Sequence, residues 1–390
     1  MCSNPMKIAF HSLNCLFDPV SGAAKSVRTI LEGLAARGHE VVSVTAACFD
    51  RPEHINEGDM LTSLGFEKIG KHWQCRDSGV NHIAFEGGAS NVGKLNHSQM
   101  AHVARDVLDE LEQIEPAVML SYGGTSAELA VRAHMARRDT PVVFYLANPN
   151  YKDRECFEDV DLVMCDTDAT SRHYRNSLAL GSVVIGKFVH PVETVASETS
   201  RYVTFVNPTY EKGATLFYRI AEMMTEHRPE TRFQVIESRR TLQSIQKETD
   251  LPFNRLANIR LAGPQRDMAR VYARTKVLLI PSLWHESGPR VALEALSLGI
   301  PIVASDHIGV CDIVAGAGRL IKVPVKLRDT NRLIPPARIA LPWVAAIEDL
   351  MYDGTAYQKA SDEALLCWQK FQDLDGIGRV EEHLVKLIAH

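Results

Sequence analysis

The sequence lacks the features that mark several protein classes. Its 390 residues contain no low-complexity tract and no apolar run close to the roughly 18 residues of a membrane span. The amino terminus has no basic stretch followed by an apolar one, so we expect no secretory signal and a cytoplasmic protein. Its eight cysteines include no C-x-x-C pair. That pattern favours reduced thiols over disulfides or a metal site.

The sequence also lacks an excess of positive charge. The net charge is −5, and residues 1–195 contain 18 basic and 25 acidic side chains. The remainder contains 25 basic and 23 acidic side chains. This distribution argues against nucleic acid as a partner, because nucleic-acid-binding domains gather lysine and arginine on one face.

The chain is long enough for two domains, each with its own core. Short buried strands alternate with amphipathic helices, a pattern typical of doubly wound parallel sheets in α/β proteins. Residues 193–200 are small and polar, which predicts a linker. We therefore expect one domain over residues 1–191, a second over 192–376 and a last helix over 377–390.

Residues 278–306 hold the densest group of candidate functional residues. A buried apolar strand ends at Pro281, and a turn that carries Glu286 leads into a helix. The helix begins near Pro289 and stops at Gly299, after which a second strand follows. The turn is thus predicted at the carboxyl end of a parallel strand, where open α/β sheets bind ligands.

Two carboxylates stand in a fixed relation within this stretch. Glu286 lies at the mouth of the helix, and Glu294 lies about two turns further along. The first backbone N–H groups of the helix, at Arg290 and Val291, suit a phosphate. That phosphate would repel Glu286 unless the carboxylate reached a different part of the ligand. A ligand with central phosphates and a polyol at each end, such as a nucleotide sugar, fits these features.

The two glutamates, followed by Ala295 and the strand GIPIVAS, resemble the E-x7-E signature of retaining GT-B glycosyltransferases of the family 4 type. The resemblance runs through nearly the whole chain. It implies an α/β protein with two doubly wound, Rossmann-like domains that face a central cleft, the last helix returning to the first domain. The first domain would lie on the acceptor side, and the second would bind the nucleotide sugar.

The resemblance also implies the reaction. A sugar would move, with retention of anomeric configuration, from a nucleoside diphosphate sugar to a hydroxyl, without a metal or a resident cofactor. Among donors we favour a UDP-sugar. Members of this type that dock on anionic membranes generally carry a basic N-terminal half, which this chain lacks. We therefore expect a soluble glycan or a small molecule as acceptor.

The site residues follow from the family motifs. The first glutamate would contact the donor sugar, the second would bind the ribose, and Lys212 matches a family lysine on the donor phosphates. Glu286 and Lys212 are therefore the candidate catalytic residues. The candidate donor-binding residues are Gly22, Ala23, Asn207, Lys212, Arg239, Gly263, Glu286, Ser287, Gly288, Pro289, Arg290, Val291 and Glu294.

The sequence departs from the family at two donor positions. Asn207 stands where the family has an arginine. Arg239 or Arg240 could supply the missing cation, or both could be solvated surface residues. Gly22 is a single glycine in a loop that is glycine-rich in the family, and a lone glycine before a helix can also be a simple turn.

A third departure concerns the transferred sugar. Ala147 replaces a histidine that contacts this sugar in related enzymes, and Asn148 is the polar residue left on the sugar and acceptor side. The departures leave open a nucleotide-sugar-binding protein with little or no transferase activity. A sugar-nucleotide epimerase ranks last, because such enzymes generally lack the E-x7-E context. Residues 50–100, the variable acceptor wall of the family, show no readable pattern.

Overall fold

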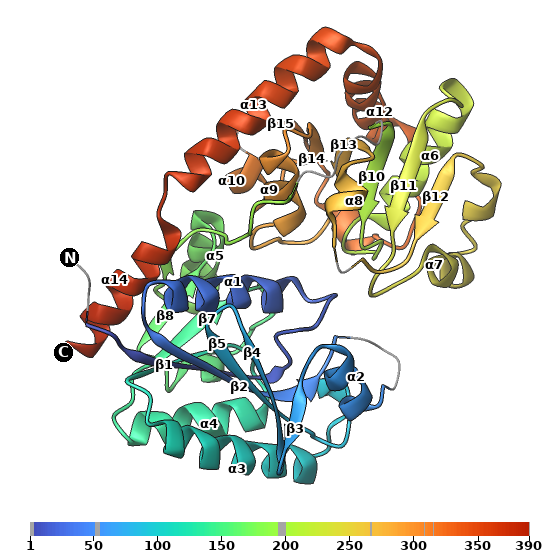
Figure 1. Ribbon diagram of the computed structural model, residues 1–390. Coiled ribbons are helices and arrows are strands. Elements are labelled where there is room, and N and C mark those ends of the chain that lie inside the picture. Colours follow the sequence, from blue (N-terminus) through green and yellow to red (C-terminus); the bar gives the residue numbers. More distant parts are fainter. Residues whose placement is uncertain are drawn as a thin grey trace. The chain divides into compact units, whose positions relative to one another are not determined.

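The computed structural model describes residues 4–50, 55–193, 200–265, 267–307, 309–314 and 316–389. The chain divides into two compact units, coloured in sequence order in Figure 1. The first unit comprises Met1–Phe188 and Asp375–His390, and the second comprises Val189–Leu374. These limits lie within three residues of the expected boundaries at 191 and 376. Most of the linker expected over 193–200 lies outside the described residues.

The first unit is a sheet with helices on both faces. Its strands are β1 (Lys7–Asn14), β2 (Glu40–Cys48), β3 (Glu67–Ile69), β4 (His72–Asp77), β5 (Val80–Phe85), β6 (Val118–Ser121), β7 (Val142–Leu146), β8 (Leu162–Cys165) and β9 (Val183–Val184). Its helices are α1 (Gly22–Ala36), α2 (Glu57–Ser63), η1 (Val92–Lys94), α3 (His97–Ile114), α4 (Ser126–Arg137), η2 (Arg154–Phe157), α5 (Asp168–Leu178) and α14 (Gly376–Ile388). The strands run in the order β3-β4-β5-β2-β1-β6-β7-β8-β9.

Alternation along β1 separates the two cores of this unit. Ile8 and Phe10 face the layer built by α1, α5 and α14. Ala9 and Leu13 face the opposite layer, built by α3 and α4. Because successive side chains of a strand point to opposite faces, one apolar strand supplies both cores.

Residues 55–100 contain structure that the sequence pattern did not reveal. The strands β4 and β5 pair antiparallel, and β5 joins the parallel sheet beside β2. Ser78 and Gly79, between them, have φ angles of +49° and +84°. Two successive positive φ angles are typical of the tight type I′ turn that suits the twist of a hairpin.

The second unit has the strand order of a Rossmann sheet. Its strands are β10 (Tyr202–Val206), β11 (Arg232–Ile236), β12 (Ile259–Ala262), β13 (Thr275–Ile280), β14 (Ile302–Ser305) and β15 (Gly318–Ile321). Its helices are α6 (Ala214–His227), α7 (Leu242–Thr249), η3 (Phe253–Arg255), α8 (Ala269–Tyr272), α9 (Arg290–Ser297), α10 (Val310–Val314), α11 (Lys326–Asp329), α12 (Ala337–Tyr352) and α13 (Gly354–Gln372). If these six strands are renumbered 1 to 6 along the chain, their order in the sheet is 3-2-1-4-5-6. All of the strands are parallel, but the order in which they are added reverses between β10 and β13.

The strand β13 is buried on both faces. Val277 and Leu279 pack against α6 and α12, whereas Leu278 and Ile280 pack against α9 and α10. The short apolar run that ends at Pro281 is therefore a central strand, as the sequence predicts. In the part of the chain that the structure describes, no helix is both long and apolar enough to cross a membrane.

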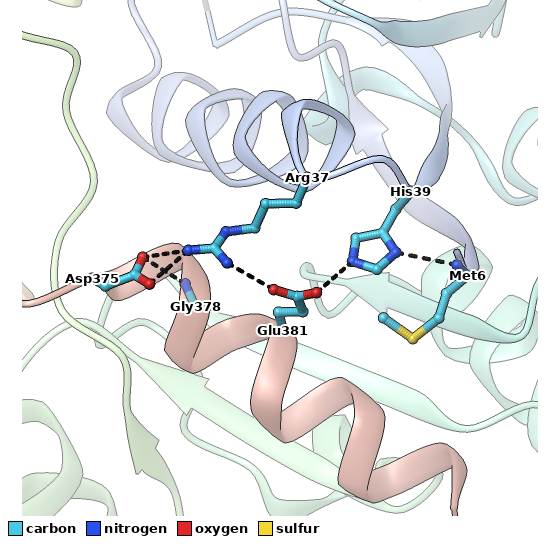
Figure 2. Close-up of polar contacts among 6 residues, drawn as sticks. All are labelled: Met6, Arg37, His39, Asp375, Gly378 and Glu381. Carbon is cyan, nitrogen blue, oxygen red and sulfur yellow. Dashed lines mark hydrogen bonds and ion pairs between the residues drawn. The ribbon is translucent and has the colours of Figure 1, made fainter. Parts of the chain in front are cut away.

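The helix α14 docks on the first unit although it follows the second in sequence. Figure 2 shows Arg37, at the end of α1, between Asp375 and Glu381. Its guanidinium nitrogens lie 2.6 Å from Asp375 Oδ2 and 2.9 Å from Glu381 Oε2. His39 Nε2 lies 3.2 Å from Glu381, and its Nδ1 accepts a hydrogen bond of 3.1 Å from the backbone N–H of Met6. These contacts fix α14 to α1 and to the beginning of β1.

We predict that apolar packing, more than these ion pairs, holds α14 in place. Leu384 is fully buried, so Leu384→Ala should lower the free energy of unfolding of the first unit by about 2–5 kcal/mol. The side chain of Arg37 is 36% exposed and that of Asp375 is 68% exposed. Arg37→Ala should therefore lower the free energy of unfolding by no more than about 1 kcal/mol. Urea unfolding followed by circular dichroism measures both variants.

Leu365→Ala is the matched control, because Leu365 is a helical leucine that is 46% exposed. Its unfolding should match that of the unaltered protein. A larger loss for Arg37→Ala than for Leu384→Ala would show that the ion pairs hold the helix.

Candidate functional site

The candidate site lies at the reversal point of the second sheet. The loop of residues 207–213 follows β10, and the loop of residues 281–289 follows β13, its neighbour in the sheet. The backbone N–H of Leu283 donates to the carbonyl oxygen of Glu211 at 2.8 Å, which ties the two loops together. A crevice at such a switch point is where open α/β sheets bind ligands.

An ion pair joins the two candidate catalytic residues across these loops. The Nζ of Lys212 contacts Oε1 of Glu286, and Ser282 Oγ donates to the same oxygen at 2.8 Å. The Lys212 Nζ also lies 5.6 Å from the ring centroid of Trp284, within reach of a cation–π interaction. Glu286 is only 5% exposed. A carboxylate so buried needs a cation and hydrogen bonds, and Lys212 and Ser282 supply them.

Two glycines allow the backbone to close tightly around this pair. Gly213 has a φ of +84°, and a Cβ there would lie 1.9 Å from the carbonyl oxygen of Pro281. Gly309 has a φ of +83°, and a Cβ there would lie 1.6 Å from the carbonyl oxygen of Glu286. Only glycine fits at either position, for reasons of both conformation and space.

We predict that Gly309→Ala displaces Glu286 and lowers the free energy of unfolding by more than about 1 kcal/mol. The physical reason is the overlap with a backbone atom, which a side-chain rotation cannot relieve. The control is Gly354→Ala in the same unit, where a Cβ meets no atom within 4 Å. Thermal unfolding compares the two variants, and equal melting temperatures would contradict the close packing at Gly309.

Two helices begin beside the ion pair without a side-chain cap. The N-cap residues are Gly213 for α6 and Pro289 for α9, and neither has a side-chain oxygen to accept from the first N–H groups. Those N–H groups have no partner within their own helices, and the helix dipole places positive charge there. Residues 287–291, at the beginning of α9, therefore form a positively polarised helix end that attracts an anion.

Glu294 lies on α9, with a side chain that is 13% exposed. Tyr272 donates its hydroxyl to Glu294 Oε2 at 2.7 Å, and the Arg290 guanidinium lies 3.5 Å from Oε1. Tyr272 was absent from the residues predicted from the sequence. Its position at the end of α8, a helix of four residues, gives no local signal of this contact.

Asn207 has a structural role that the sequence did not indicate. Its φ angle is +59°, a left-handed conformation that asparagine adopts more readily than most residues. Its side-chain oxygen accepts a hydrogen bond of 3.2 Å from Ser238 Oγ, which links the loop after β10 to the loop after β11. An amide carries no charge, so Asn207 cannot replace the arginine of the family.

The remaining candidates in the second unit lie further along the same edge of the sheet. Arg239 is exposed, on the loop after β11. Arg240 forms an ion pair of 2.5 Å with Glu248, so its charge is already engaged. Gly263 follows β12, which is separated from β10 by β11. The structure thus groups Lys212, Glu286 and the beginning of α9, whereas Arg239 and Gly263 lie on the loops after β11 and β12.

Gly22 and Ala23 open the first helix of the first unit. They are the first residues of α1, and Ser21 caps the helix by accepting a hydrogen bond of 3.3 Å from the N–H of Ala24. Their place after β1 corresponds to that of residues 207–213 after β10. Their role toward a donor stays a prediction.

Ala147 and Asn148 follow β7 in a loop held by its own contacts. Ala147 is 6% exposed and belongs to the apolar core below α1. Asn148 Oδ1 accepts from the N–H of Asn150 at 3.0 Å, and its carbonyl accepts from the Tyr174 hydroxyl at 3.3 Å. The position of Ala147 is therefore filled by packing, and its role beside a sugar stays a prediction.

A buried glutamate that the sequence analysis missed supports this edge of the first sheet. Glu128 accepts hydrogen bonds of 3.0 Å from the N–H groups of Leu13 and Thr125. Arg132 donates to the carbonyl oxygen of Gly123 at 3.1 Å. Burial raises the pKa of Glu128. The sequence T-S-A-E has the capping-box spacing that could have revealed the contact with Thr125.

Comparison with known proteins agrees with the fold. Residues 200–353 match the family model of glycosyl transferases group 1. No curated protein sequence matches the chain significantly. Similar solved structures include sucrose-phosphate synthase from Thermosynechococcus elongatus, with 14% identity, a TM-score of 0.70, and coverage of 98% of this chain and 99% of that chain.

Two further structures are similar over their whole length. HepE from Anabaena, in complex with UDP and glucose, has 17% identity and a TM-score of 0.67, over 98% of this chain and 99% of its own. The catalytic domain of starch synthase IV from Arabidopsis thaliana, bound to ADP and acarbose, has 11% identity and a TM-score of 0.68, over 99% of this chain and 100% of its own. The predicted fold, with two Rossmann-like α/β domains, is confirmed. The shared fold and the family match together support the assignment of the chain as a glycosyltransferase with the GT-B fold.

Proposed function

We propose that the protein is a retaining glycosyltransferase of the family 4 type. It would move a sugar from a nucleoside diphosphate sugar, with a UDP-sugar favoured, to a hydroxyl of a soluble glycan or small molecule. The observation that carries the proposal is the Lys212–Glu286 pair at the reversal point of the sheet, within the segment that matches the glycosyltransferase family model.

The donor fits the site as follows. Its diphosphate lies between the Lys212 ammonium and the beginning of α9, where both the side-chain charge and the helix dipole are positive. Glu286 accepts hydrogen bonds from hydroxyls of the transferred sugar, and Glu294 accepts from the ribose. Gly263, after β12, lies toward the nucleotide base, and Arg239, after β11, could supply a second cation for the phosphates.

The reaction needs charge stabilisation more than a protein nucleophile. The bond between the anomeric carbon and the diphosphate oxygen breaks, and a bond to the acceptor oxygen forms on the same face. The acceptor proton passes to the leaving phosphate, so charges and atoms balance. Lys212 stabilises the negative charge that develops on the diphosphate. Within the described residues no group of three or more His, Cys, Asp or Glu side chains is placed to hold a metal, and the independence from metals stays a prediction.

Phosphate and Glu286 compete for the same ammonium. Lys212 contacts Glu286, and a diphosphate beside α9 would offer the ammonium a second negative partner. As Lys212 turns toward the phosphate, Glu286 becomes an acceptor for sugar hydroxyls. The side chain of Lys212 is 23% exposed, so it retains the freedom to make this exchange.

The test of the proposal is binding followed by turnover. UDP, GDP, ADP and their glucose conjugates are screened by thermal shift, because a ligand of the folded state raises the melting temperature. One nucleotide should raise it for the unaltered protein and raise it less for Glu294→Ala. If none does, the proposal fails. Binding without product from any acceptor sugar would favour the alternative, a nucleotide-sugar-binding protein, for which Ala147 and Asn207 are the motivating departures.

We predict that Lys212→Ala lowers kcat/KM for the donor by roughly 10²-fold, the scale of losing one group that stabilises charge in the transition state. Initial rates at low donor concentration give this value. Lys359→Ala is the control, because Lys359 is an exposed cation on α13, and the rate of this variant should stay close to that of the unaltered protein. A nearly silent Lys212→Ala together with a large loss for Arg239→Ala or Arg240→Ala would assign the phosphate to that arginine.

A further inference from the structure

Tyr272, on α8, contacts Glu294, the residue of α9 that is proposed to bind the ribose. It is the last residue of α8, is 2% exposed, and donates its hydroxyl to Glu294 Oε2 at 2.7 Å. Burial, together with the nearby Glu294 carboxylate, raises the pKa of Tyr272 well above its ordinary value. The hydroxyl therefore keeps its proton and acts as a donor across the physiological pH range.

The contact with Tyr272 occupies one acceptor position of the Glu294 carboxylate and leaves others for a ligand. An ionised carboxylate offers about four acceptor positions on its two oxygens. Tyr272 occupies one on Oε2, and the Arg290 guanidinium lies 3.5 Å from Oε1. The two partners lie on different oxygens, so they hold the plane of the carboxylate. Both oxygens keep acceptor capacity for an adjacent pair of hydroxyls.

We propose that Tyr272 is a positioning residue that orients the Glu294 carboxylate toward the two ribose hydroxyls of the donor nucleotide. This inference rests on the proposed function, which assigns Glu294 to the ribose. Tyr272 acts through Glu294 and does not contact the nucleotide itself. Its contribution is to keep the carboxylate in one orientation before the ligand arrives, so that binding does not have to order a mobile side chain.

The experiment is calorimetric titration with UDP, GDP or ADP, whichever binds the unaltered protein most tightly, and with the 2′,3′-dideoxy form of that nucleotide. Tyr272→Phe removes the hydroxyl and keeps the ring. It should weaken binding of the ribonucleotide about tenfold, the effect of roughly one hydrogen bond to a charged group. It should leave binding of the dideoxy nucleotide unchanged, because that ligand has no hydroxyls for Glu294 to accept from.

Tyr218→Phe is the matched control. Tyr218 is a buried tyrosine of α6 that donates its hydroxyl to Glu222 at 3.1 Å and packs against Phe253. Its loss should leave both affinities unchanged. The double variant Tyr272→Phe with Glu294→Ala should bind no more weakly than Glu294→Ala alone, because Tyr272 has no other route to the ribose.

The outcomes separate this inference from the proposed function. If Glu294→Ala leaves ribonucleotide affinity unchanged, the role of Glu294 is wrong and the inference fails with it. If Glu294→Ala weakens binding and Tyr272→Phe does not, only the inference fails. Equal losses for the ribonucleotide and the dideoxy nucleotide in Tyr272→Phe would show that the hydroxyl merely maintains the fold near α8, which also overturns it.

Discussion

The ion pair between Lys212 and Glu286 is the interaction on which the candidate site depends. The two residues are separated by 74 positions in sequence, yet each belongs to a loop that follows one of two adjacent strands. The reversal of the Rossmann sheet brings the loops together, and the glycines at 213 and 309 let the backbones approach without a side chain between them. Charge, topology and backbone packing therefore converge on a single pair of side chains.

Local patterns were sufficient to predict much of the fold. The helix α4 begins with a capping box formed by Thr125 and Glu128, and α6 carries amphipathic spacing, so the signals for each helix lie within its own segment. The apolar run before Pro281 and the stop at Gly299 located β13 and α9 for the same reason. The loop that carries Glu286 was predicted at the carboxyl end of a parallel strand, and it follows β13 at the reversal point of the sheet.

Non-local contacts were the part that could not be predicted. Nothing in the sequence near Tyr272 indicates that its hydroxyl meets Glu294, since that contact depends on the packing of α8 against α9. The burial of Ala147 depends on a core assembled from several strands and helices. The hairpin of β4 and β5 is a different case. The strand β4 is only half-buried along its length, so its sequence shows no clear alternation of apolar and polar residues.

The return of α14 to the first unit makes the second unit an insertion within the first. Both ends of the insertion meet closely, because a Cβ on Gly376 would lie 2.7 Å from the ring of Phe188. During synthesis the first unit therefore cannot complete its core until the ribosome has made the whole of the second unit, Val189–Leu374. Until then, the apolar surface that Val380 and Leu384 cover stays exposed. The second unit has all of its strands and helices before the first is complete. The order of synthesis is thus not the order in which the two cores can close.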